Sequence, residues 1–459
     1  MMTIGDLDWR PEIGAGDDPA YLRIIDALAA DIGRGALSPG ARLPTQRALA
    51  NRLGLGIGTV TRAYTEAGQR GLIEGVVGRG SFVAASAPPP SDGVIDLSRN
   101  VPPIGPSRAA LRRAMAAIAK RGDLADRLDY APDGGFAADR RAAGGWLARA
   151  ANFPGVDPTR LIMTSGAQQA IFVALTAACR PGDALIVETA TFHGVKLAAA
   201  HAGLKLVPTA MDAEGLTPEA LTRAAAESGA RAAYVQPYQN PTARVMSFER
   251  RRALVEAAAR AGVLLIEDDL YGPIVGELGL PPLALLAPAQ VAYVSGLSKS
   301  LGPGLRAGFL MMPDRYVAAA HDILRAAAFG SPTFTAPVGT HWIETGEAYQ
   351  ILDAVRAELT RRAALASRLL EGLVEQPTPA ATSHLWAPAG ELDAERIAGA
   401  ASRAGVRLTP PSAPFAPGAP VSGLRICLGG AADLDALERA LGVLAALLQP
   451  GRALAENVV

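Results

Sequence analysis

Lys299 is the residue whose surroundings point most directly to chemistry. It follows the apolar run Val291–Val294 after a short turn, and it is one of only four lysines in 459 residues. A lysine at the end of a buried strand has a depressed pKa, and its neutral amine can form a Schiff base with an aldehyde. Arg306 follows seven residues later, and a guanidinium beside a helix N-terminus can bind a phosphate.

Other apolar runs end in side chains that complement an aldehyde phosphate. The segment 165–168, Ser-Gly-Ala-Gln, opens a helix with small residues, so its backbone N–H groups can bind an anion. Phe192 offers an aromatic face for stacking, and Asp268 can keep a pyridine nitrogen protonated. Asn240 and Tyr271 can hydrogen-bond a phenolate oxygen. Together these are the requirements of pyridoxal 5′-phosphate.

The elements that position these residues are apolar runs alternating with alanine-rich helices. Runs without polar alternation, separated by helices, predict an α/β fold whose sheet is buried on both faces. Ligands of such sheets bind beyond the carboxyl ends of the strands, where the residues above lie. The predicted strands are Leu161–Thr164, Ala184–Glu188, Leu204–Pro208, Ala232–Gln236, Val263–Glu267 and Val291–Val294, with helices over Ala167–Ala178, Pro218–Glu227 and Phe248–Ala261.

A second, smaller domain is expected before this α/β region. Helical spacing of apolar residues predicts helices over Tyr21–Arg34, from an N-cap at Thr45 to Leu53, and over Thr59–Arg70. Short strands at 72–74 and 81–83 follow, joined by a glycine-rich turn. Three helices and a hairpin are typical of the winged helix-turn-helix, which places a helix in the DNA major groove.

The clearest boundary between the two regions is the segment Ala84–Gly93, which contains three consecutive prolines. Prolines favour an extended, semi-rigid chain and prevent a helix from continuing. We therefore expect a mainly α-helical DNA-binding domain at 18–86, a linker at 87–95 and a pyridoxal-phosphate-binding domain at 96–450.

Composition excludes several classes of protein. Hydrophobic residues make up 49% and charged residues 19%, which excludes a disordered chain. Forty-four basic residues balance forty-four acidic ones, so any DNA-binding surface must be local. Two cysteines, Cys179 and Cys427, cannot form a disulfide framework or a cysteine-based zinc site, and no metal is expected. Without a signal peptide or an apolar span of about 18 residues, we expect a cytoplasmic protein that does not enter membranes.

The segment from Asp18 to about Ser86 strongly resembles the GntR family of DNA-binding domains. That resemblance implies that Arg47 and Arg62 lie near phosphates or bases, with Thr59 and Thr61 beside them, while Arg79 belongs to the wing. Eight arginines against five acidic residues give this segment a charge of about +3, enough to steer it toward phosphates. Gly56-Ile57-Gly58 departs from the polar residue and arginine of many relatives, and a protein-binding helical domain remains the alternative.

The order of the motifs SGAQQA, ETATFHG, QNPT, IEDDLYG and SKSLGPGLRAG resembles the fold-type I aminotransferase family, from about Asp96 to Pro450. The resemblance implies that Lys299 binds the cofactor covalently and that Asp268 pairs with its pyridine nitrogen. It also implies that Tyr271 and Asn240 contact the ring oxygen and that Phe192 stacks on the ring. The phosphate would be held by Ala167, Gln168, Ser298 and Arg306.

Two further residues are assigned by the same resemblance. Arg425 is similar to the arginine that binds the α-carboxylate of an amino acid, and Tyr130 to the tyrosine that reaches the phosphate of the partner subunit, which implies a homodimer. Gly296 departs from the family, because many relatives have serine or threonine three residues before the lysine. Ala243-Arg244 likewise replaces a more usual glycine.

A winged helix fused to an aminotransferase-like domain is the arrangement of the MocR-like subfamily of GntR regulators. It implies a transcription regulator that binds DNA, with a dimer favouring paired half-sites, and senses an amine or amino acid through the cofactor. A working aminotransferase with a helical appendage is the alternative, because Lys299 and Arg425 would suffice for a half-reaction. A scaffold without cofactor is disfavoured while Lys299, Asp268 and Arg306 are all present.

Overall fold

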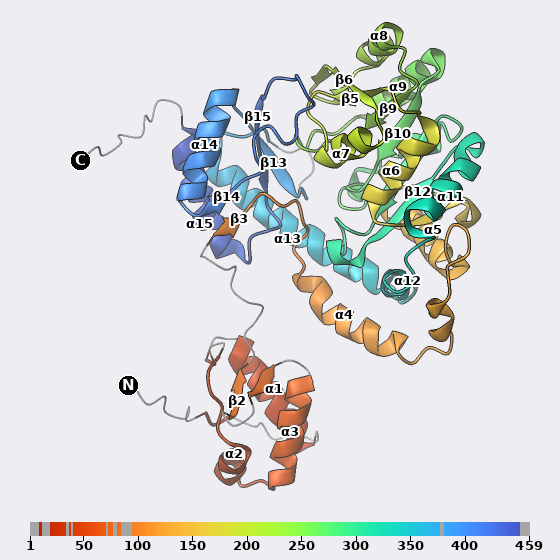
Figure 1. The fold of residues 1–459 in the computed structure, drawn as a ribbon. Helices are drawn as coiled ribbons and strands as arrows, with labels where there is room; N and C mark the ends of the chain where they lie inside the picture. Colours follow the sequence, from red (N-terminus) through yellow and green to blue (C-terminus); the bar gives the residue numbers. More distant parts are fainter. Residues whose placement is uncertain are drawn as a thin grey trace. The chain divides into compact units, whose positions relative to one another are not determined.

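The computed structural model divides the chain into two compact units, Met1–Gly93 and Val94–Val459 (Figure 1). The residues that the structure describes are 9–11, 19–33, 36–37, 40–69, 72–76, 80–83, 94–376 and 381–449. The predicted division falls close to these units, but its exact limits, 18–86 and 96–450, stay predictions.

The small unit consists of three helices and a hairpin. They are α1 (Ala20–Gly33), α2 (Gln46–Leu53), α3 (Ile57–Gln69), β1 (Ile73–Val76) and β2 (Gly80–Val83). The Thr45 side chain caps α2 by accepting a hydrogen bond from the Ala48 N–H group, and Gly54 ends it at a φ of 64°. α3 begins at Ile57, two residues earlier than predicted, so Gly58 lies inside the helix. The two strands pair antiparallel, as expected for a wing.

One apolar cluster holds the small unit together. Ile24, Ile25 and Leu28 of α1 are buried with Val60 and Tyr64 of α3. On α1, Ile24 is fully covered while Leu22 and Ile32 are only half-buried. The Tyr64 hydroxyl donates to the Pro44 carbonyl, which fixes the segment before α2 against α3.

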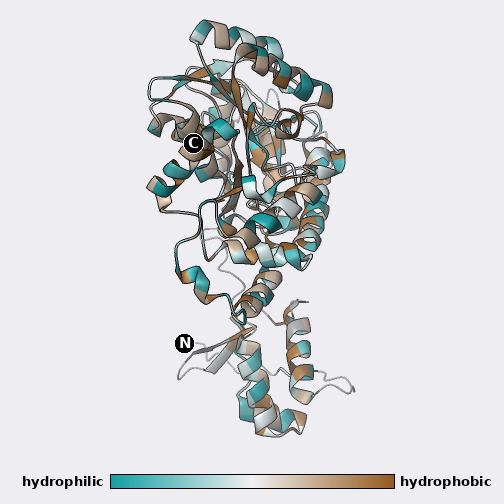
Figure 2. Cartoon of the chain, turned by 90° about the vertical axis from the view of Figure 1, so that its right-hand side faces the viewer, coloured by the Kyte–Doolittle hydropathy of each residue, from teal (hydrophilic) through white to brown (hydrophobic). Residues whose placement is uncertain are grey.

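The large unit is built on a seven-stranded sheet covered by helices on both faces (Figure 2). β12 is antiparallel to both neighbours, and the other strands run parallel. Six of the strands are buried nearly throughout, in agreement with their continuous apolar sequences, while the edge strand over Lys205–Thr209 is partly exposed. In order across the sheet they are β4 (Ile162–Ser165), β12 (Ala307–Met311), β11 (Val291–Gly296), β10 (Leu264–Asp268), β9 (Ala232–Val235), β5 (Ala184–Glu188) and β6 (Lys205–Thr209).

The helices between these strands begin and end close to the predicted residues. Thr217 and Ser247 cap α8 and α9, and Gly229 and Gly262 end them in the left-handed region. The main helices of the large unit are α4 (Gly105–Ile118), α5 (Ala137–Ala150), α6 (Ala167–Ala178), α7 (His193–His201), α8 (Pro218–Ser228), α9 (Phe248–Ala261), α11 (Asp314–Ala328), α12 (Ala336–Glu344) and α13 (Glu347–Leu369).

A smaller subdomain of the large unit has its own apolar core. The chain enters this subdomain as β3 (Ile95–Asp96), which pairs in parallel with β14 (Val406–Arg407). β13 (His384–Pro388) and β15 (Gly423–Cys427) form an antiparallel pair, covered by α14 (Glu391–Arg403) and α15 (Leu434–Leu448). Within the described residues, no helix is long and apolar enough to cross a membrane.

Candidate functional site

All but one of the predicted cofactor residues line a single cavity of ≈ 130 Å³ beyond the carboxyl ends of the strands. They come from five separate segments, each following a strand, so the sheet brings them together as expected. The lining consists of Ala167, Gln168, Phe192, Gln236, Asn240, Asp268, Leu270, Tyr271, Ser298, Lys299, Pro303 and Arg306.

Lys299 lies half-buried in the cavity wall. Its Nζ donates to the backbone carbonyl of Asn100, and it lies 5.9 Å from the centre of the Tyr271 ring. Burial, assisted by the nearby positive charge of Arg425, lowers the pKa of Lys299 to about 8. A substantial fraction of the amine is therefore neutral near physiological pH, which is the form that attacks an aldehyde.

Asp268 ends β10 as a buried carboxylate facing the cavity. Its oxygens accept hydrogen bonds from the Tyr234 hydroxyl, the Gln236 amide at 3.2 Å and the Leu270 N–H group at 3.3 Å. Burial raises the pKa of Asp268, while these bonds and the charge of Lys299 oppose the rise. A buried carboxylate gains most from a cationic partner, and a protonated pyridine nitrogen fits that need.

The opposite end of the cavity suits a phosphate. Arg306 is exposed, its Nη2 donates to the Ser165 carbonyl at 2.8 Å, and no side chain caps the start of α6 at Ala167. The guanidinium lies against Gly166, where an added Cβ would be 2.5 Å from Nη2. The backbone N–H groups that open α6 and the guanidinium thus form a positively polarised pocket, with Ser298 on its wall.

Phe192 and Gln168 pack around Gly194 at the start of α7. The Gln168 amide donates to the Gly194 carbonyl at 2.8 Å, and a Cβ at Gly194 would lie 2.2 Å from the Phe192 ring. Only glycine leaves space for the ring in this position. Phe192 therefore has a fixed place in the cavity wall, as stacking on a flat ligand requires.

Arg425 is buried next to the cavity and contacts Asn240. Its Nη1 donates to Asn240 Oδ1 at 2.8 Å, and its Nη2 donates to the Ser98 carbonyl and to Thr409 Oγ1. Its Nε is buried without an acceptor in the part of the chain that the structure describes. A buried guanidinium with a spare donor is suited to a carboxylate that enters the cavity.

Some residues of the site were not predicted from the sequence. Gln236 and Tyr234 hold Asp268, while Ser98 and Asn100 supply the carbonyls that contact Arg425 and Lys299. Gln236 could have been found, because it ends a predicted strand as the other site residues do. Asn100 and Ser98 carry no such signal, since they reach the site from the start of the large unit, about 200 residues before Lys299.

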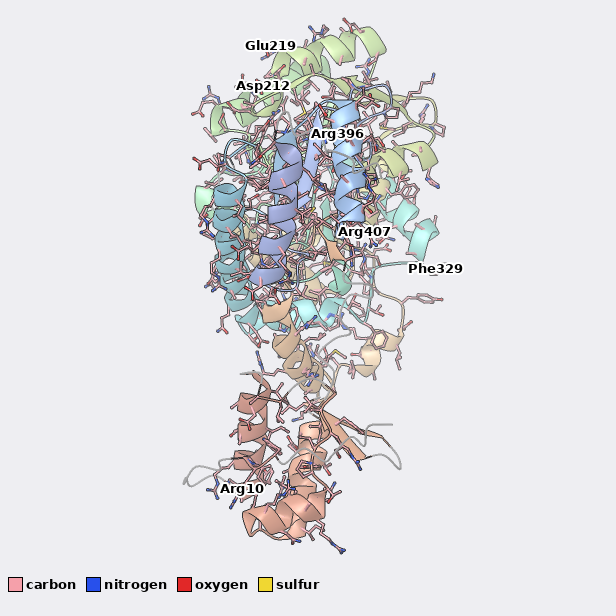
Figure 3. All side chains as sticks on the ribbon, turned by 90° about the vertical axis from the view of Figure 1, so that its left-hand side faces the viewer. Arg10, Asp212, Glu219, Phe329, Arg396 and Arg407 are labelled. Atoms are coloured by element: carbon pink, nitrogen blue, oxygen red, sulfur yellow. The ribbon has the colours of Figure 1, made fainter. Side chains whose placement is uncertain are left out.

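Tyr130 is the predicted cofactor residue that does not line this cavity. It is 72% exposed, and its ring lies 4.9 Å from Phe329, which is 64% exposed and projects outward (Figure 3). Both aromatic rings border a separate hollow with His321 and Arg325. Tyr130 therefore does not contact the cofactor site of its own chain, and a role in a partner's site stays a prediction.

The structure explains one of the two departures from the aminotransferase family and places the other in a backbone conformation that favours glycine. Gly296 pairs with Gly308 of β12, and a Cβ at Gly296 would lie 2.6 Å from the Ala307 carbonyl oxygen. A serine or threonine therefore does not fit there without a backbone shift. Ala243 adopts a φ of 60°, a conformation that favours glycine, while the adjacent Arg244 pairs with Glu375.

The predicted DNA-contacting residues lie on α2 and α3 of the small unit. Arg47, Thr61 and Arg62 are exposed and Thr59 is half-buried. Two of them also contact neighbours: the Thr61 hydroxyl donates to Gln46, and the Arg62 guanidinium stacks 4.0 Å from the centre of the Tyr21 ring. Arg79 lies outside the described residues. The DNA-binding roles of all five stay predictions.

The fold and the cavity define a class of protein: an α/β domain of the pyridoxal-phosphate-dependent type, joined to a winged helix. Comparison with known families agrees. Residues 92–444 match the family "Aminotransferase class I and II", whose cofactor is pyridoxal 5′-phosphate, and residues 20–83 match "Bacterial regulatory proteins, gntR family". The chain belongs to the aminotransferase class I and II family and carries a GntR-type DNA-binding domain, a combination consistent with the MocR-like subfamily.

Similar proteins include named transcription regulators. The chain is 28% identical to the uncharacterized HTH-type transcriptional regulator YdeF of Bacillus subtilis, over 80% of each protein. It is also 28% identical to the pyridoxine biosynthesis transcriptional regulator PdxR of Corynebacterium glutamicum, over 61% of this chain and 63% of that protein. The fused domains and these relatives identify a regulator of the HTH type.

Solved structures support the fold of the large unit. An archaeal alanine:glyoxylate aminotransferase superposes with a TM-score of 0.71 and 21% identity, covering 85% of this chain and 94% of that one. The α-aminoadipate aminotransferase LysN of Thermus thermophilus gives 0.70 and 22%, covering 78% and 92%. At these identities the likeness concerns the fold alone.

Proposed function

We propose that the protein regulates transcription by binding DNA through its small unit and sensing an amine or amino acid through its large unit. The observation that carries the proposal is the convergence of Lys299, Asp268, Arg306 and Arg425 on one cavity in a chain that also has a GntR-type domain. Such a regulator acts where DNA is, so we propose a cytoplasmic location.

Each residue would have a distinct task toward bound pyridoxal phosphate. Lys299 attaches the cofactor through its neutral amine, and Asp268 holds the proton on the pyridine nitrogen. Arg306, Ser298 and the start of α6 bind the phosphate. The cofactor, when bound, supplies an electrophilic carbon with which an amine can exchange for Lys299.

Arg425 is the proposed contact for a carboxylated effector. Its guanidinium is already oriented by Asn240, Ser98 and Thr409, so a carboxylate meets a preorganised fork. An amino acid would then be held at two points, by its amine at the place of Lys299 and by its carboxylate at Arg425. A simple amine would use the first point alone.

A homodimer is the assembly that we propose, because Tyr130 and Phe329 are large, exposed and lie outside their own chain's cofactor cavity. A dimer carries two winged helices, each joined to a large unit by the short segment 87–95. We therefore propose an operator with two half-sites, contacted by Arg47, Thr59, Thr61, Arg62 and the wing residue Arg79.

A working aminotransferase is the second candidate. The observation that favours it is that both groups needed for a transamination half-reaction lie at the cavity. Lys299 can supply a neutral amine as the base, and Arg425 a cation that binds the carboxylate. The 2-aminoadipate transaminase of Thermus thermophilus is 28% identical over 45% of this chain and 52% of that enzyme. Any turnover here would use the same lysine as base.

One experiment separates the two functions. The full chain, loaded with pyridoxal phosphate, is titrated with amino acids and simple amines while its visible absorbance, its affinity for upstream DNA and the release of keto acid are followed. A regulator is expected to change its absorbance and its DNA affinity together, with at most one equivalent of keto acid. Sustained keto acid release without any change in DNA affinity would contradict the proposal and support the enzyme.

A further inference from the structure

A chain of polar groups leads from Gln239 to Tyr271 behind the cavity, and no role described above uses it. His384, the first residue of β13, and Asn100, which follows β3, are both buried. His384 Nε2 lies 3.3 Å from the Gln239 carbonyl oxygen, and His384 Nδ1 lies 2.9 Å from Asn100 Nδ2. The same Asn100 Nδ2 lies 2.9 Å from the Tyr271 hydroxyl oxygen.

The Gln239 carbonyl sets the tautomer of His384. A carbonyl oxygen can only accept, so the hydrogen of the neutral imidazole must be on Nε2, and Nδ1 must be an acceptor. Burial and the charge of Arg425 lower the pKa of His384 to about 3, so the ring is neutral at physiological pH. Gln239 is itself fixed, since its side chain bonds Glu188, the Ala190 carbonyl and Thr242.

The tautomer of His384 in turn sets the orientation of Asn100. Of the two ends of the Asn100 amide, only the NH₂ group can donate to Nδ1, and its second hydrogen then points to the Tyr271 oxygen. The reversed amide would place Asn100 Oδ1 opposite the lone pair of Nδ1. In the observed orientation Oδ1 is buried without a donor among the described residues, which is a cost that the other two bonds must offset.

The chain of hydrogen bonds from Gln239 through His384 and Asn100, called the relay below, ends at Tyr271. Because its oxygen accepts from Asn100, its own hydrogen is free to be donated into the cavity that it lines. Burial raises the pKa of Tyr271, so the hydroxyl keeps that hydrogen. The charged or titratable groups nearest to Tyr271 are Arg425, Asp268 and Cys427, and Arg425 and Lys299 also face His384.

We propose that His384 and Asn100 are positioning residues that commit the Tyr271 hydroxyl to donate its hydrogen to the ring oxygen of the cofactor. The inference rests on the proposed function, since it needs a cofactor in this cavity. Loss of the relay frees Asn100 to rotate its amide and take the Tyr271 hydrogen for Oδ1. The ring oxygen then loses a donor although Tyr271 itself is unchanged.

The visible band of the bound cofactor reports on that donor without any turnover. A hydrogen bond to the ring oxygen withdraws electron density and lowers the basicity of the conjugated chromophore, so losing the bond raises the pH midpoint of the band. Tyr271→Phe, which removes the donor outright, should raise the midpoint by about one pH unit, equivalent to about 1.4 kcal/mol. The Tyr271→Phe shift is therefore the largest shift of the midpoint that we expect from breaking the relay.

The relay is tested by spectral titration of the full, cofactor-loaded chain. His384→Phe should raise the midpoint by an appreciable part of the Tyr271→Phe shift, and His384→Asn, whose amide oxygen can replace Nδ1 as acceptor, should restore it. Ser383→Ala is the matched control, because Ser383 Oγ also lies 3.1 Å from Nδ1 but is not between His384 and Tyr271. In the double variant Tyr271→Phe/His384→Phe, the midpoint should equal that of Tyr271→Phe.

A second variant keeps the test decisive if His384→Phe does not fold. Asn100→Asp has the same size but can only accept, so it should take the Tyr271 hydrogen and raise the midpoint. In the Tyr271→Phe background there is no hydroxyl hydrogen for the new carboxylate to accept. The midpoint shift caused by Asn100→Asp there reports the added charge alone, and it should be smaller than in the protein with Tyr271. Equal shifts in the two backgrounds would overturn the relay.

The remaining outcomes are equally distinct. A His384→Phe protein with a wild-type midpoint, or a shift that adds in full to that of Tyr271→Phe, overturns the relay while the cofactor site stands. A wild-type protein that gains no visible band after addition of pyridoxal phosphate overturns the proposed function, and the relay with it.

Discussion

The cavity of the large unit and the exposed face of α2 and α3 are opposite kinds of site. In the cavity, side chains from distant segments point at one small volume, and burial lowers the pKa of Lys299 to about 8. On the helices of the small unit, Arg47 and Arg62 are exposed, and Arg62 rests on the ring of Tyr21. The side chains of a concave site are held in place by the protein before the ligand binds. The exposed side chains of a convex site make their contacts only when the partner binds. Single substitutions should therefore have much larger effects in the cavity.

The largest effect is expected from Lys299→Ala. Without the amine nothing attaches the cofactor covalently, so the visible band of the attached cofactor should disappear once unattached cofactor has been removed by dialysis. The chain should stay folded, because among the residues that the structure describes Lys299 makes one hydrogen bond, to the Asn100 carbonyl. Absorbance and circular dichroism are measured on the same samples, and a variant that keeps its yellow colour would contradict the assignment.

Arg425→Lys should have the next largest effect. A lysine keeps the charge but loses the fork that fits a carboxylate, which should cost about 2–5 kcal/mol, roughly thirtyfold or more in affinity for a carboxylated effector. Cofactor binding should be unchanged, because Arg425 lies at the Asn240 side of the cavity, away from Arg306.

The measurement for Arg425 is a titration of amino acids against the visible spectrum. Arg407→Lys is the matched control, since Arg407 lies in the same subdomain but is exposed and contacts Asp96. Loss of the cofactor from Arg425→Lys, or an unchanged response to an effector that needs its carboxylate, would count against the role.

The pKa of Lys299 predicts a pH dependence for cofactor attachment. Because burial lowers this pKa to about 8, the neutral amine increases about tenfold per unit below pH 8 and levels off above it. The rate at which the cofactor-free protein gains visible absorbance should follow that curve. A free alkyl amine is the reference, and its rate should keep rising to about pH 10. If the rate for the protein also rose to that pH, the cavity would not lower the pKa of Lys299.

The smallest effects are expected on the helical face. Arg47→Ala and Arg62→Ala should each remove about one phosphate contact per winged helix and lower the steepness of the log–log slope of DNA affinity against salt by about one unit for each winged helix bound. Between 50 and 200 mM salt that amounts to roughly a three- to fourfold difference. Arg10→Ala is the control, since Arg10 is exposed on the small unit but lies outside these helices (Figure 3). If both variants keep the wild-type slope, the two arginines do not contact phosphates and their role is structural.

The sequence predicted the elements of the sheet well because its strands are continuously apolar and its helices are capped by recognisable residues. β5, α6 and α9 begin and end at the predicted residues. β12 was missed, since Ala307–Met311 follows the Lys299 segment with only a short 3-10 turn, Pro303–Leu305, between them and runs antiparallel. Local sequence carries the apolar pattern of a strand but not the direction in which the chain returns.

The same limit applies to the site. Residues that follow a strand could be predicted from their place in the chain, and Asp268, Lys299 and Asn240 do share a cavity. Asn100 and His384 could not, because their 2.9 Å contact joins positions 284 residues apart through the smaller subdomain. Tyr130 shows the reverse case, since a resemblance suggested its role but the proposed contact would need a second chain.

The Gly296–Gly308 pair restricts how this domain can evolve. Restoring a hydroxyl at 296 would drive a Cβ to within 2.6 Å of the Ala307 carbonyl oxygen, and a side chain at 308 would come within 2.4 Å of the Gly166 carbonyl carbon. Each glycine is therefore locked in by backbone that also shapes the phosphate end of the cavity. A hydroxyl at 296 would therefore need a backbone shift in addition to the substitution itself. Laboratory evolution toward transaminase activity should find solutions elsewhere in the cavity before it finds Gly296→Ser.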